Sequence, residues 1–341
     1  MRRLHSVAWA ALAGLFLAAC STPQSTPPPS ATSAPLETGQ APGATATGAN
    51  GAGLTIAVVP KAVSQQFWNA VKDGAEAAAK EAGATVLWKG PSLETDVNGQ
   101  KGIVEDFVTQ KVDAIVLAAT DADALVPTIE KAEAAGVPVI TIDSGVNYAN
   151  VRSLVATDNQ AGGQLGGEKL IELIGGEGEV GLIPFVKGAA SSEAREAGFK
   201  AAVEATGGKV KLVSTLYSES SIATAAKVAD DMMTANPNLK GIFAANESGT
   251  VGAANAVKAK GKAGEILVVG FDGSKEEVAA LQDGSVQALV LQDPFKMGGE
   301  GVKQAILAAR GEAVEKLVDT GVLVVTKDNL DSEEAKKLLG Y

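Results

Sequence analysis

The stretch VPVITID, residues 137–143, decides the fold class expected of this chain. Its four central residues, Val139 to Ile142, are all β-branched, and no charged or amide side chain alternates with them. A strand of this kind is buried on both faces, which is typical of a parallel sheet with crossover helices on either side. The run stops at Asp143, so the strand is predicted to present a carboxylate at its carboxyl end.

The same pattern recurs along the chain from Leu54 onward. Short apolar runs that indicate strands cover residues 54–59, 85–88, 114–119, 137–142, 154–156, 180–185, 212–216, 241–245, 266–271 and 288–291. The longer segments between them carry apolar residues at helical spacing, as at Ile103, Val104 and Phe107. Ten strands with helices between them are more than a single hydrophobic core is expected to contain in a chain of this length. The sequence therefore predicts an α/β protein with two lobes and parallel sheets.

Polar side chains follow closely on five of the predicted strands. They are Asp143, Asp158, Asn246, Asp272 and the pair Gln292 and Asp293. The carboxyl ends of parallel strands lie along one edge of an open sheet, where α/β proteins bind their ligands. We therefore expect these side chains to converge on a ligand that makes several hydrogen bonds. The alternative is that some of them cap the helix that follows, which aspartate and asparagine do well.

An aromatic pair, Phe67 and Trp68, stands just past the first predicted strand, at the start of the first helix. Aromatic residues make up only 4% of the chain, so an adjacent pair at this place is informative. Flat aromatic faces suit the C–H side of a sugar ring. The pair is therefore a candidate for ligand stacking. The alternative is that both rings pack into the core at the start of the helix.

Arg195 opens the helix that follows the run at residues 180–185. A positive charge near a helix N-terminus is unfavourable for the helix dipole, which indicates another purpose for this side chain. A guanidinium directed at ligand oxygens would be one such purpose. The alternative is a surface ion pair with Glu193 or Glu196.

The first residues read as an export signal. Arg2 and Arg3 precede an apolar run, residues 7–19, that is too short for a permanent membrane span. The run leads into the sequence LAAC, which resembles the lipobox of bacterial lipoproteins, in which Cys20 would carry a lipid. The alternative is an ordinary signal peptide with a chance cysteine. We expect a leader at 1–19, then a lipidated Cys20 and a flexible Ser-, Thr- and Pro-rich tether over 20–53.

Composition excludes several classes of protein. His5, the only histidine, lies in the predicted leader, and Cys20 is the only cysteine. The mature chain therefore has no histidine-based catalytic pair, no disulfide and no His/Cys zinc site. The match to G-x-G-x-x-G at residues 176–181 ends a predicted helix, whereas a dinucleotide fingerprint opens one. Loss of Arg2 and Arg3 takes the formal net charge from −11 to −13, which disfavours nucleic acid as a partner. No cofactor and no metal ion are expected.

Several of these stretches together resemble the type I periplasmic sugar-binding proteins of ABC importers, the ribose-binding protein family. The stretches are FWNAVKDG (67–74), VPVITID (137–143), ATDN (156–159), AREAGF (194–199) and VVGFDG (268–273). The resemblance runs from about residue 54 to about 325. It implies two Rossmann-like lobes with parallel sheets, joined by three crossover segments near 157–158, 292–293 and 320. The lobes would comprise residues 54–157 plus 293–320, and 158–292 plus 321–341.

The resemblance also implies a ligand site between the lobes. Phe67 and Trp68 would stack on the sugar, and Asp143 and Asp272 would bind its hydroxyl groups. Further hydrogen bonds would come from Gln65, Arg195, Asn246 and Gln292. The chain departs from the ribose-binding pattern by carrying Ser144 in place of an arginine, Ala118 in place of an asparagine, and Ser220 in place of an aromatic residue. The expected ligand is therefore a sugar or polyol of a shape other than ribose.

The expected function is that of a monomeric, extracytoplasmic lipoprotein, anchored to the membrane only by its lipid, that delivers a monosaccharide or polyol to the membrane subunits of an ABC permease. The fold leaves other functions open. These are a binder of a nucleoside, amino acid or autoinducer, a sugar sensor for a chemoreceptor or kinase, and a cytoplasmic repressor domain. An exported glycosidase that uses Asp143 and Asp272 is a further alternative.

Overall fold

The structure is a computed structural model that describes residues 51–340. The predicted leader, Cys20 and the predicted tether up to residue 50 lie outside the described residues. The described part begins with a turn at 51–53, in which the Gly51 N–H donates to the Ala82 carbonyl oxygen at 2.9 Å. The fold therefore includes residues 51–53, which the sequence analysis assigned to the tether.

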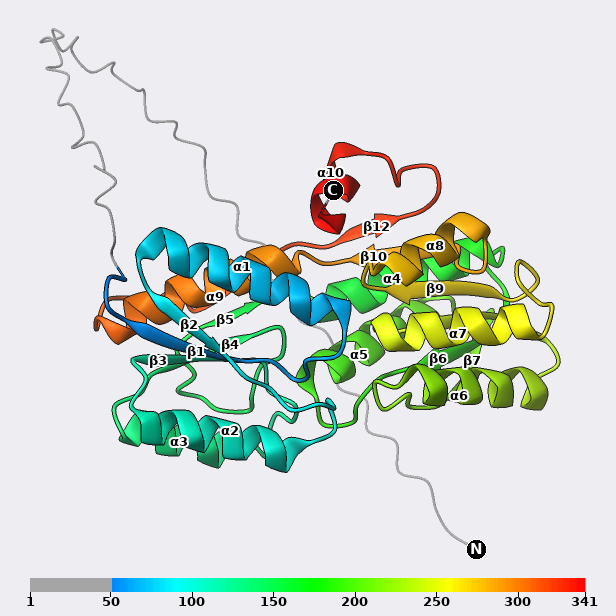
Figure 1. The fold of residues 1–341 in the computed structure, drawn as a ribbon. Coiled ribbons are helices and arrows are strands. Elements are labelled where there is room, and N and C mark those ends of the chain that lie inside the picture. Colours follow the sequence, from blue (N-terminus) through cyan, green and yellow to red (C-terminus); the bar gives the residue numbers. More distant parts are fainter. Residues whose placement is uncertain (1–50, 341) are drawn as a thin grey trace, which may run out of the picture. The chain divides into compact units, whose positions relative to one another are not determined.

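The first of two sheets is entirely parallel, with the strand order β11-β5-β4-β3-β1-β2, of which β1 to β5 are labelled in Figure 1. Its strands are β1 (Thr55–Val59), β2 (Thr85–Trp88), β3 (Ala114–Leu117), β4 (Val139–Ile142), β5 (Leu154–Ala156) and β11 (Leu317–Asp319). Helices α1 (Gln66–Ala82) and α9 (Pro294–Ala309) pack on one face, and α2 (Val97–Gln110) and α3 (Val126–Ala134) pack on the other. The VITI run of β4 is completely buried, as its lack of alternation predicted.

The second sheet has the order β12-β10-β9-β8-β6-β7. Its strands are β6 (Gly178–Ile183), β7 (Val210–Thr215), β8 (Leu239–Ala244), β9 (Leu267–Phe271), β10 (Ala288–Leu291) and β12 (Leu323–Val325). All of its pairings are parallel except that β12 runs antiparallel to β10. The prediction of an α/β fold with two mainly parallel sheets is thus confirmed, and the antiparallel edge strand is an addition to it.

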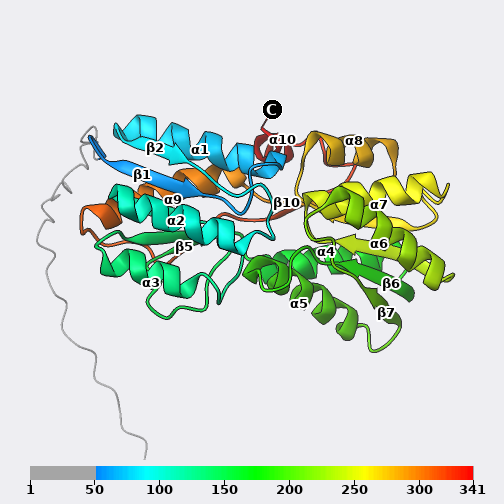
Figure 2. The same cartoon turned by 60° about the horizontal axis from the view of Figure 1, so that its bottom comes forward.

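The helices of the second sheet also divide between its two faces (Figure 2). Helices α4 (Asn159–Leu173) and α5 (Ala190–Ala205) pack on one face. The other face is covered by α6 (Ile222–Ala235), α7 (Glu247–Ala259) and α8 (Lys275–Asp283), together with the short α10 (Glu333–Leu339). Each sheet therefore lies between two apolar layers. Among the described residues, no helix combines the length and apolar character needed to cross a membrane.

The chain passes from one sheet to the other three times: between β5 and α4, between β10 and α9, and between β11 and β12. The first and third crossings lie against each other, because the Thr157 hydroxyl donates to the Gly321 carbonyl oxygen at 3.0 Å and lies 3.3 Å from the Thr320 hydroxyl. The crossings therefore lie at residues 157–158, 292–293 and 320–322. That the two halves move as separate bodies stays a prediction.

Candidate functional site

A small cavity lies where the carboxyl ends of strands from both sheets meet. It is lined by Lys61, Gln65, Phe67, Trp68, Glu94, Asp143, Phe185, Arg195, Asn246, Glu247, Asp272 and Gln292. All eight residues that the sequence analysis proposed as ligand contacts are among these twelve. The four that it missed are Lys61, Glu94, Phe185 and Glu247.

The two aspartates occupy matching places at the ends of their strands. Asp143 follows β4 and Asp272 follows β9, and each keeps a backbone hydrogen bond of 2.9 Å, to Val155 and Val290 respectively. Both have a left-handed backbone, with φ of 57° and 87°. Such a backbone is rare outside glycine and costs roughly 1–2 kcal/mol for each residue. Backbone strain of this kind clusters at functional sites, so its presence at both aspartates is consistent with a ligand-binding role.

Arg195 projects from α5 into the cavity and is only 2% exposed. Its Nε–H donates to Asn159 Oδ1 and an Nη1–H donates to the Ala245 carbonyl oxygen, both at 2.8 Å. Its guanidinium carbon lies 3.7 Å from the centre of the Phe271 ring, a cation–π distance. Burial lowers the pKa of Arg195, and the nearby carboxylates of Asp272 and Asp143 oppose this shift.

The surroundings of Arg195 exclude the surface ion pair that was the alternative to a ligand-binding role. Glu193 accepts from the Gly188 N–H, and Glu196 pairs with Lys200, so neither forms the surface ion pair with Arg195. The helix carrying Arg195 lies unusually close to α4. A Cβ added at Gly163 would stand 2.1 Å from the Arg195 carbonyl oxygen, so only glycine permits this approach. The close packing fixes the base of the arginine side chain.

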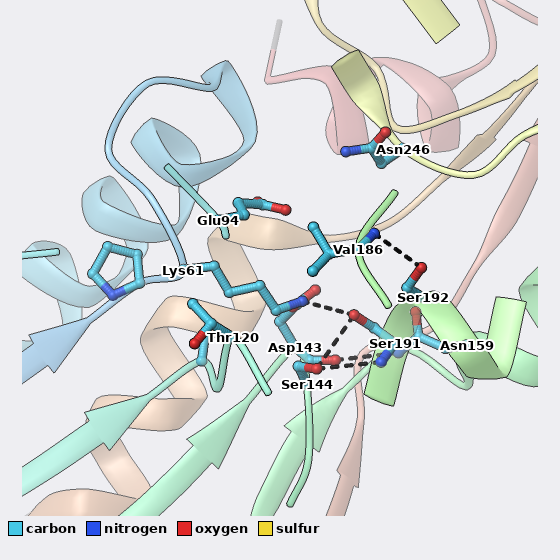
Figure 3. Close-up of polar contacts among 12 residues, drawn as sticks. Lys61, Glu94, Thr120, Asp143, Ser144, Asn159, Val186, Ser191, Ser192 and Asn246 are labelled. Atoms are coloured by element: carbon cyan, nitrogen blue, oxygen red, sulfur yellow. Dashed lines mark hydrogen bonds and ion pairs between the residues drawn. The ribbon is translucent and has the colours of Figure 1, made fainter. Parts of the chain in front are cut away.

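Lys61 forms a buried ion pair with Asp143 that the sequence analysis did not predict. Its Nζ lies 2.6 Å from Asp143 Oδ2 and donates to Ser191 Oγ at 2.7 Å (Figure 3). Ser191 belongs to α5 of the second half, and its backbone N–H donates to the Ser144 hydroxyl at 3.2 Å. Ser144, which replaces the arginine of the ribose-binding pattern, therefore forms a hydrogen bond between the two halves. Lys61 follows β1 closely, so the rule of polar residues at strand ends would have identified it.

Trp68 takes part in both the core and the cavity. It is 2% exposed and packs in the apolar layer of α1 and α9, as the packing alternative proposed. Its ring also lines the cavity, meets Phe67 edge to face at 4.9 Å, and donates its indole N–H to Glu94 Oε1 at 2.9 Å. The other oxygen of Glu94 accepts from the hydroxyl of Ser220, which accepts in turn from the Asn246 amide. This chain of hydrogen bonds links the two halves through the position where the ribose-binding pattern has an aromatic residue.

On the opposite wall, Asp272 is the centre of a second polar group. Its Oδ1 accepts from the Gln292 amide at 2.7 Å, and its Oδ2 accepts from the Glu247 N–H at 3.0 Å. Burial raises the pKa of Asp272, and the charge of Arg195 opposes this shift. The carboxylate is therefore held by its neighbours in a place where water does not fully solvate it.

The capping alternative is correct for part of the strand-end set. Asp158 caps α4 by accepting from the Ala161 N–H at 2.9 Å, and Asp293 caps α9 by accepting from the Lys296 N–H at 2.8 Å. Neither residue lines the cavity. Asn246 does both, since its Oδ1 accepts from the Gly249 N–H while its amide nitrogen lies in the cavity chain. Within residues 51–340, no group of three or more acidic, histidine or cysteine side chains is placed to hold a metal ion.

Comparison with known proteins gives consistent matches over the described part of the chain. The model of the periplasmic binding protein domain family matches residues 56–313. The D-ribose/D-allose-binding protein of Pseudomonas aeruginosa is 35% identical over 283 residues, which cover 80% of this chain and 88% of that protein. The ribose import binding protein of Bacillus subtilis is 29% identical, with 80% of this chain and 88% of that protein covered.

Two solved structures are also similar. An ABC transporter solute-binding protein from Agrobacterium vitis with bound D-fucose has a TM-score of 0.81 and 41% identity, with 84% of this chain and 99% of that chain covered. A carbohydrate transporter solute-binding protein from Agrobacterium radiobacter in complex with D-arabinose has a TM-score of 0.81 and 35% identity, with 84% and 98% covered.

Proposed function

The chain belongs to the periplasmic binding protein domain family, and from this premise we propose that its cavity captures a monosaccharide or polyol for delivery to an ABC permease. Like its relatives, it is a sugar-binding transport protein, and it is not an enzyme. The observation that carries the proposal is the set of eight predicted side chains around one cavity. The family also implies a place outside the cytoplasm.

The cavity offers the two kinds of partner that a sugar hydroxyl needs. Asp143 and Asp272 accept hydrogen bonds, whereas Arg195, Asn246 and Gln292 can donate them. These residues come from both halves of the fold. A ligand that contacts both halves favours the closed arrangement, because it makes more contacts there than in an open one. We infer that residues 54–157 plus 293–320 form one lobe, that residues 158–292 plus 321–341 form the other, and that the two lobes close on the ligand.

The departures from the ribose-binding pattern support a ligand other than ribose. Ser144 and Ser220 carry short hydroxyl groups where the ribose-binding pattern has long side chains. Each hydroxyl forms a hydrogen bond with a residue of the opposite half. Ala118 is buried and presents no polar side-chain atom. The charged residues Lys61 and Glu94 also line the cavity. We therefore expect a sugar whose hydroxyl arrangement matches these changed positions.

Isothermal titration calorimetry against a panel of sugars tests the proposal. The panel contains D-fucose, D-arabinose, D-allose, D-ribose, several hexoses and polyols, and also nucleosides and amino acids. We expect micromolar or tighter binding of at least one sugar or polyol, with ribose weaker. Binding of only a nucleoside or amino acid would reject the sugar assignment, as would the absence of binding across the panel.

We also propose that Cys20 carries a lipid and that the folded part works as a monomer held near the membrane by its tether. The support is the LAAC sequence and the Ser-, Thr- and Pro-rich segment that follows it. Mass spectrometry of the protein purified from a bacterial host should find acyl chains on Cys20. A Cys20→Ser variant should lose them and leave the membrane fraction. Equal membrane association of the two proteins would contradict the anchor.

Replacing Trp68 with alanine should weaken sugar binding by about 1–3 kcal/mol, because the ring face and its buried area are both lost. Glu94 would also lose the indole N–H that holds one of its oxygens. Trp88 is a matched control, since it lies in β2 of the same half and does not line the cavity. Calorimetry with the best sugar of the panel should show unchanged affinity for Trp88→Ala. Unchanged affinity of Trp68→Ala would remove this residue from the site.

A further inference from the structure

Helix α1 begins at the cavity without a cap from its own segment. Its N-cap residue, Gln65, makes no side-chain hydrogen bond to the first turn, and no acidic residue lies in that turn. The first backbone N–H groups of a helix have no partner within the helix and need one from elsewhere. Glu247 provides it: Oε1 accepts from the Gln66 N–H at 3.1 Å and Oε2 accepts from the Phe67 N–H at 2.9 Å.

This cap comes from the other half of the fold. Glu247 is the first residue of α7, which packs on the second sheet, whereas α1 packs on the first. A reciprocal contact lies beside it, since Gln66 Oε1 accepts from the backbone N–H of Lys275, the first residue of α8. The N-termini of three helices from two halves therefore meet at the cavity wall. These hydrogen bonds exist only when the halves are together.

The α1 terminus that Glu247 holds is the part of the helix that carries the aromatic pair. Phe67 donates its own backbone N–H to Glu247, and Trp68 is the next residue. A carboxylate at a helix N-terminus is favoured by the helix dipole as well as by its hydrogen bonds. The contact therefore fixes the position of both aromatic rings relative to a ligand in the cavity. Glu247 itself also lines the cavity.

We propose that Glu247 is a positioning residue that caps α1 across the cleft, so that closure on the sugar is coupled to the uptake of a proton. This inference rests on the proposed function of sugar capture. The ionised carboxylate can accept both N–H groups, but it is removed from water when the halves close. The protonated carboxyl keeps an accepting oxygen for α1 and costs less to bury.

The electrostatic surroundings support the proton coupling. The pKa of Glu247 is raised to about 7, chiefly by burial and in smaller part by the Asp272 and Glu276 carboxylates, whereas the hydrogen bonds from the N–H groups of Phe67 and Gln66 oppose the shift. Glu277 on α8 is a further buried acid, whose own pKa is raised well above its ordinary value by burial and by Asp272 and Glu247. The remaining charged groups of the cavity wall are Lys61, Glu94, Asp143 and Arg195.

The direction of the pH effect follows from this shift. In an open cleft water would solvate Glu247, so we expect its pKa there to lie near the ordinary value of a glutamate. Closure raises that pKa to about 7, so the closed form binds the proton more tightly than the open form does. Sugar affinity should therefore be highest below this window, fall as the pH rises through it, and level off above about pH 7. The fall is at most about tenfold for each pH unit.

The test measures the dissociation constant of the tightest sugar among D-fucose, D-arabinose and D-allose between pH 5.5 and 8.5. For the wild type we expect a rise of about tenfold or more between pH 5.5 and 7.5. Glu247→Gln keeps the shape and an accepting oxygen but cannot titrate, so its profile should be much flatter. Glu247→Ala removes both the cap and the titrating group, so its profile should also be flat, and it should bind at least about tenfold more weakly than the wild type at pH 5.5. A Glu247→Gln profile as steep as that of the wild type would overturn the proposal, as would unchanged affinity in Glu247→Ala.

Glu276→Gln is the matched control, because Glu276 is an exposed acid of the same electrostatic neighbourhood and lies outside the cavity lining. It should keep a slope close to that of the wild type. Equal thermal midpoints of the sugar-free variants would show that folding is not the cause of the changes. If the pH profile of Glu276→Gln were as flat as that of Glu247→Gln, the result would count against a specific role for Glu247.

A second measurement separates this inference from the proposed function. If no sugar of the panel binds, sugar capture fails, and the cap is then tested by NMR on sugar-free protein whose halves are held together by a Ser144→Cys/Ser191→Cys disulfide, since these two hydroxyl oxygens lie 3.4 Å apart across the cleft. Position 247 is either wild type or glutamine in this protein. The amide proton resonances of Gln66 and Phe67 should shift with pH in the wild type and not in Glu247→Gln. Amide resonances that do not respond to pH in the wild type would reject the cross-cleft cap itself.

Discussion

Replacing Asp272 with alanine should reduce sugar affinity by roughly 2–5 kcal/mol, which is thirtyfold to several thousandfold, while the sugar-free protein melts within a few degrees of the wild type. Asp272 holds the Gln292 amide at 2.7 Å and the N–H of Glu247 at 3.0 Å, and it faces the charge of Arg195. In the closed complex its removal leaves these groups without a partner and away from water. In an open cleft water can replace it, so the fold loses little.

The asparagine variant separates the charge of Asp272 from its geometry. Asparagine tolerates a left-handed backbone better than alanine does, and the φ of Asp272 is 87°. Asp272→Asn should therefore keep the backbone and one acceptor, and its affinity should fall between those of the wild type and Asp272→Ala. Calorimetry and thermal unfolding measure the two quantities. An alanine variant that fails to fold, with an asparagine variant of normal affinity, would make Asp272 a structural residue only.

Much of the fold was predictable because buried parallel strands leave a strong signal. The run at 139–142 is an example, since a continuous β-branched segment has no other common explanation in a chain with helical periodicity on either side. The strands and the helix that the sequence analysis missed are short. Strands β11 and β12 have three residues each and α10 has seven, and such lengths contain too few periods for a pattern to form. The antiparallel direction of β12 follows from where the chain returns, which no local pattern encodes.

The site was predictable where side chains follow strands and less so elsewhere. Phe185 is the last residue of a run that was expected to form a buried strand. Glu247 lies in the first turn of a helix, where an acidic side chain normally stabilises the N-terminus of that same helix. Glu94 lies in an irregular segment after β2, and its role depends on Trp68 and on Ser220, which is 126 residues away. Contacts of this kind arise from tertiary folding. Conversely, Asp158 and Asp293 satisfied the strand-end rule and proved to be caps.

The central position of Arg195 makes it the site at which a single change should do most damage. Arg195→Met fills a similar volume but removes the guanidinium, so Asn159 Oδ1 and the Ala245 carbonyl lose their donors, and Asp272 and Asp143 lose the nearby positive charge. We expect a loss of at least about 3 kcal/mol in sugar affinity, a hundredfold or more. Arg195→Lys should be nearly as weak, since one ammonium group cannot reproduce the Nε and Nη1 bonds together with stacking on Phe271.

The design of this experiment turns on a second arginine of the same chain. Arg152 makes a partly exposed ion pair with Glu133 at 3.3 Å, neither residue lines the cavity, and ion pairs near the surface contribute little to stability. Arg152→Met should therefore bind sugar as the wild type does, which controls for the loss of one positive charge from an acidic protein. Calorimetry at one pH and one salt concentration compares the three variants. If Arg195→Met and Arg152→Met bind alike, Arg195 serves the packing of α4 against α5, and the hydroxyl-binding role passes to the carboxylates and amides alone.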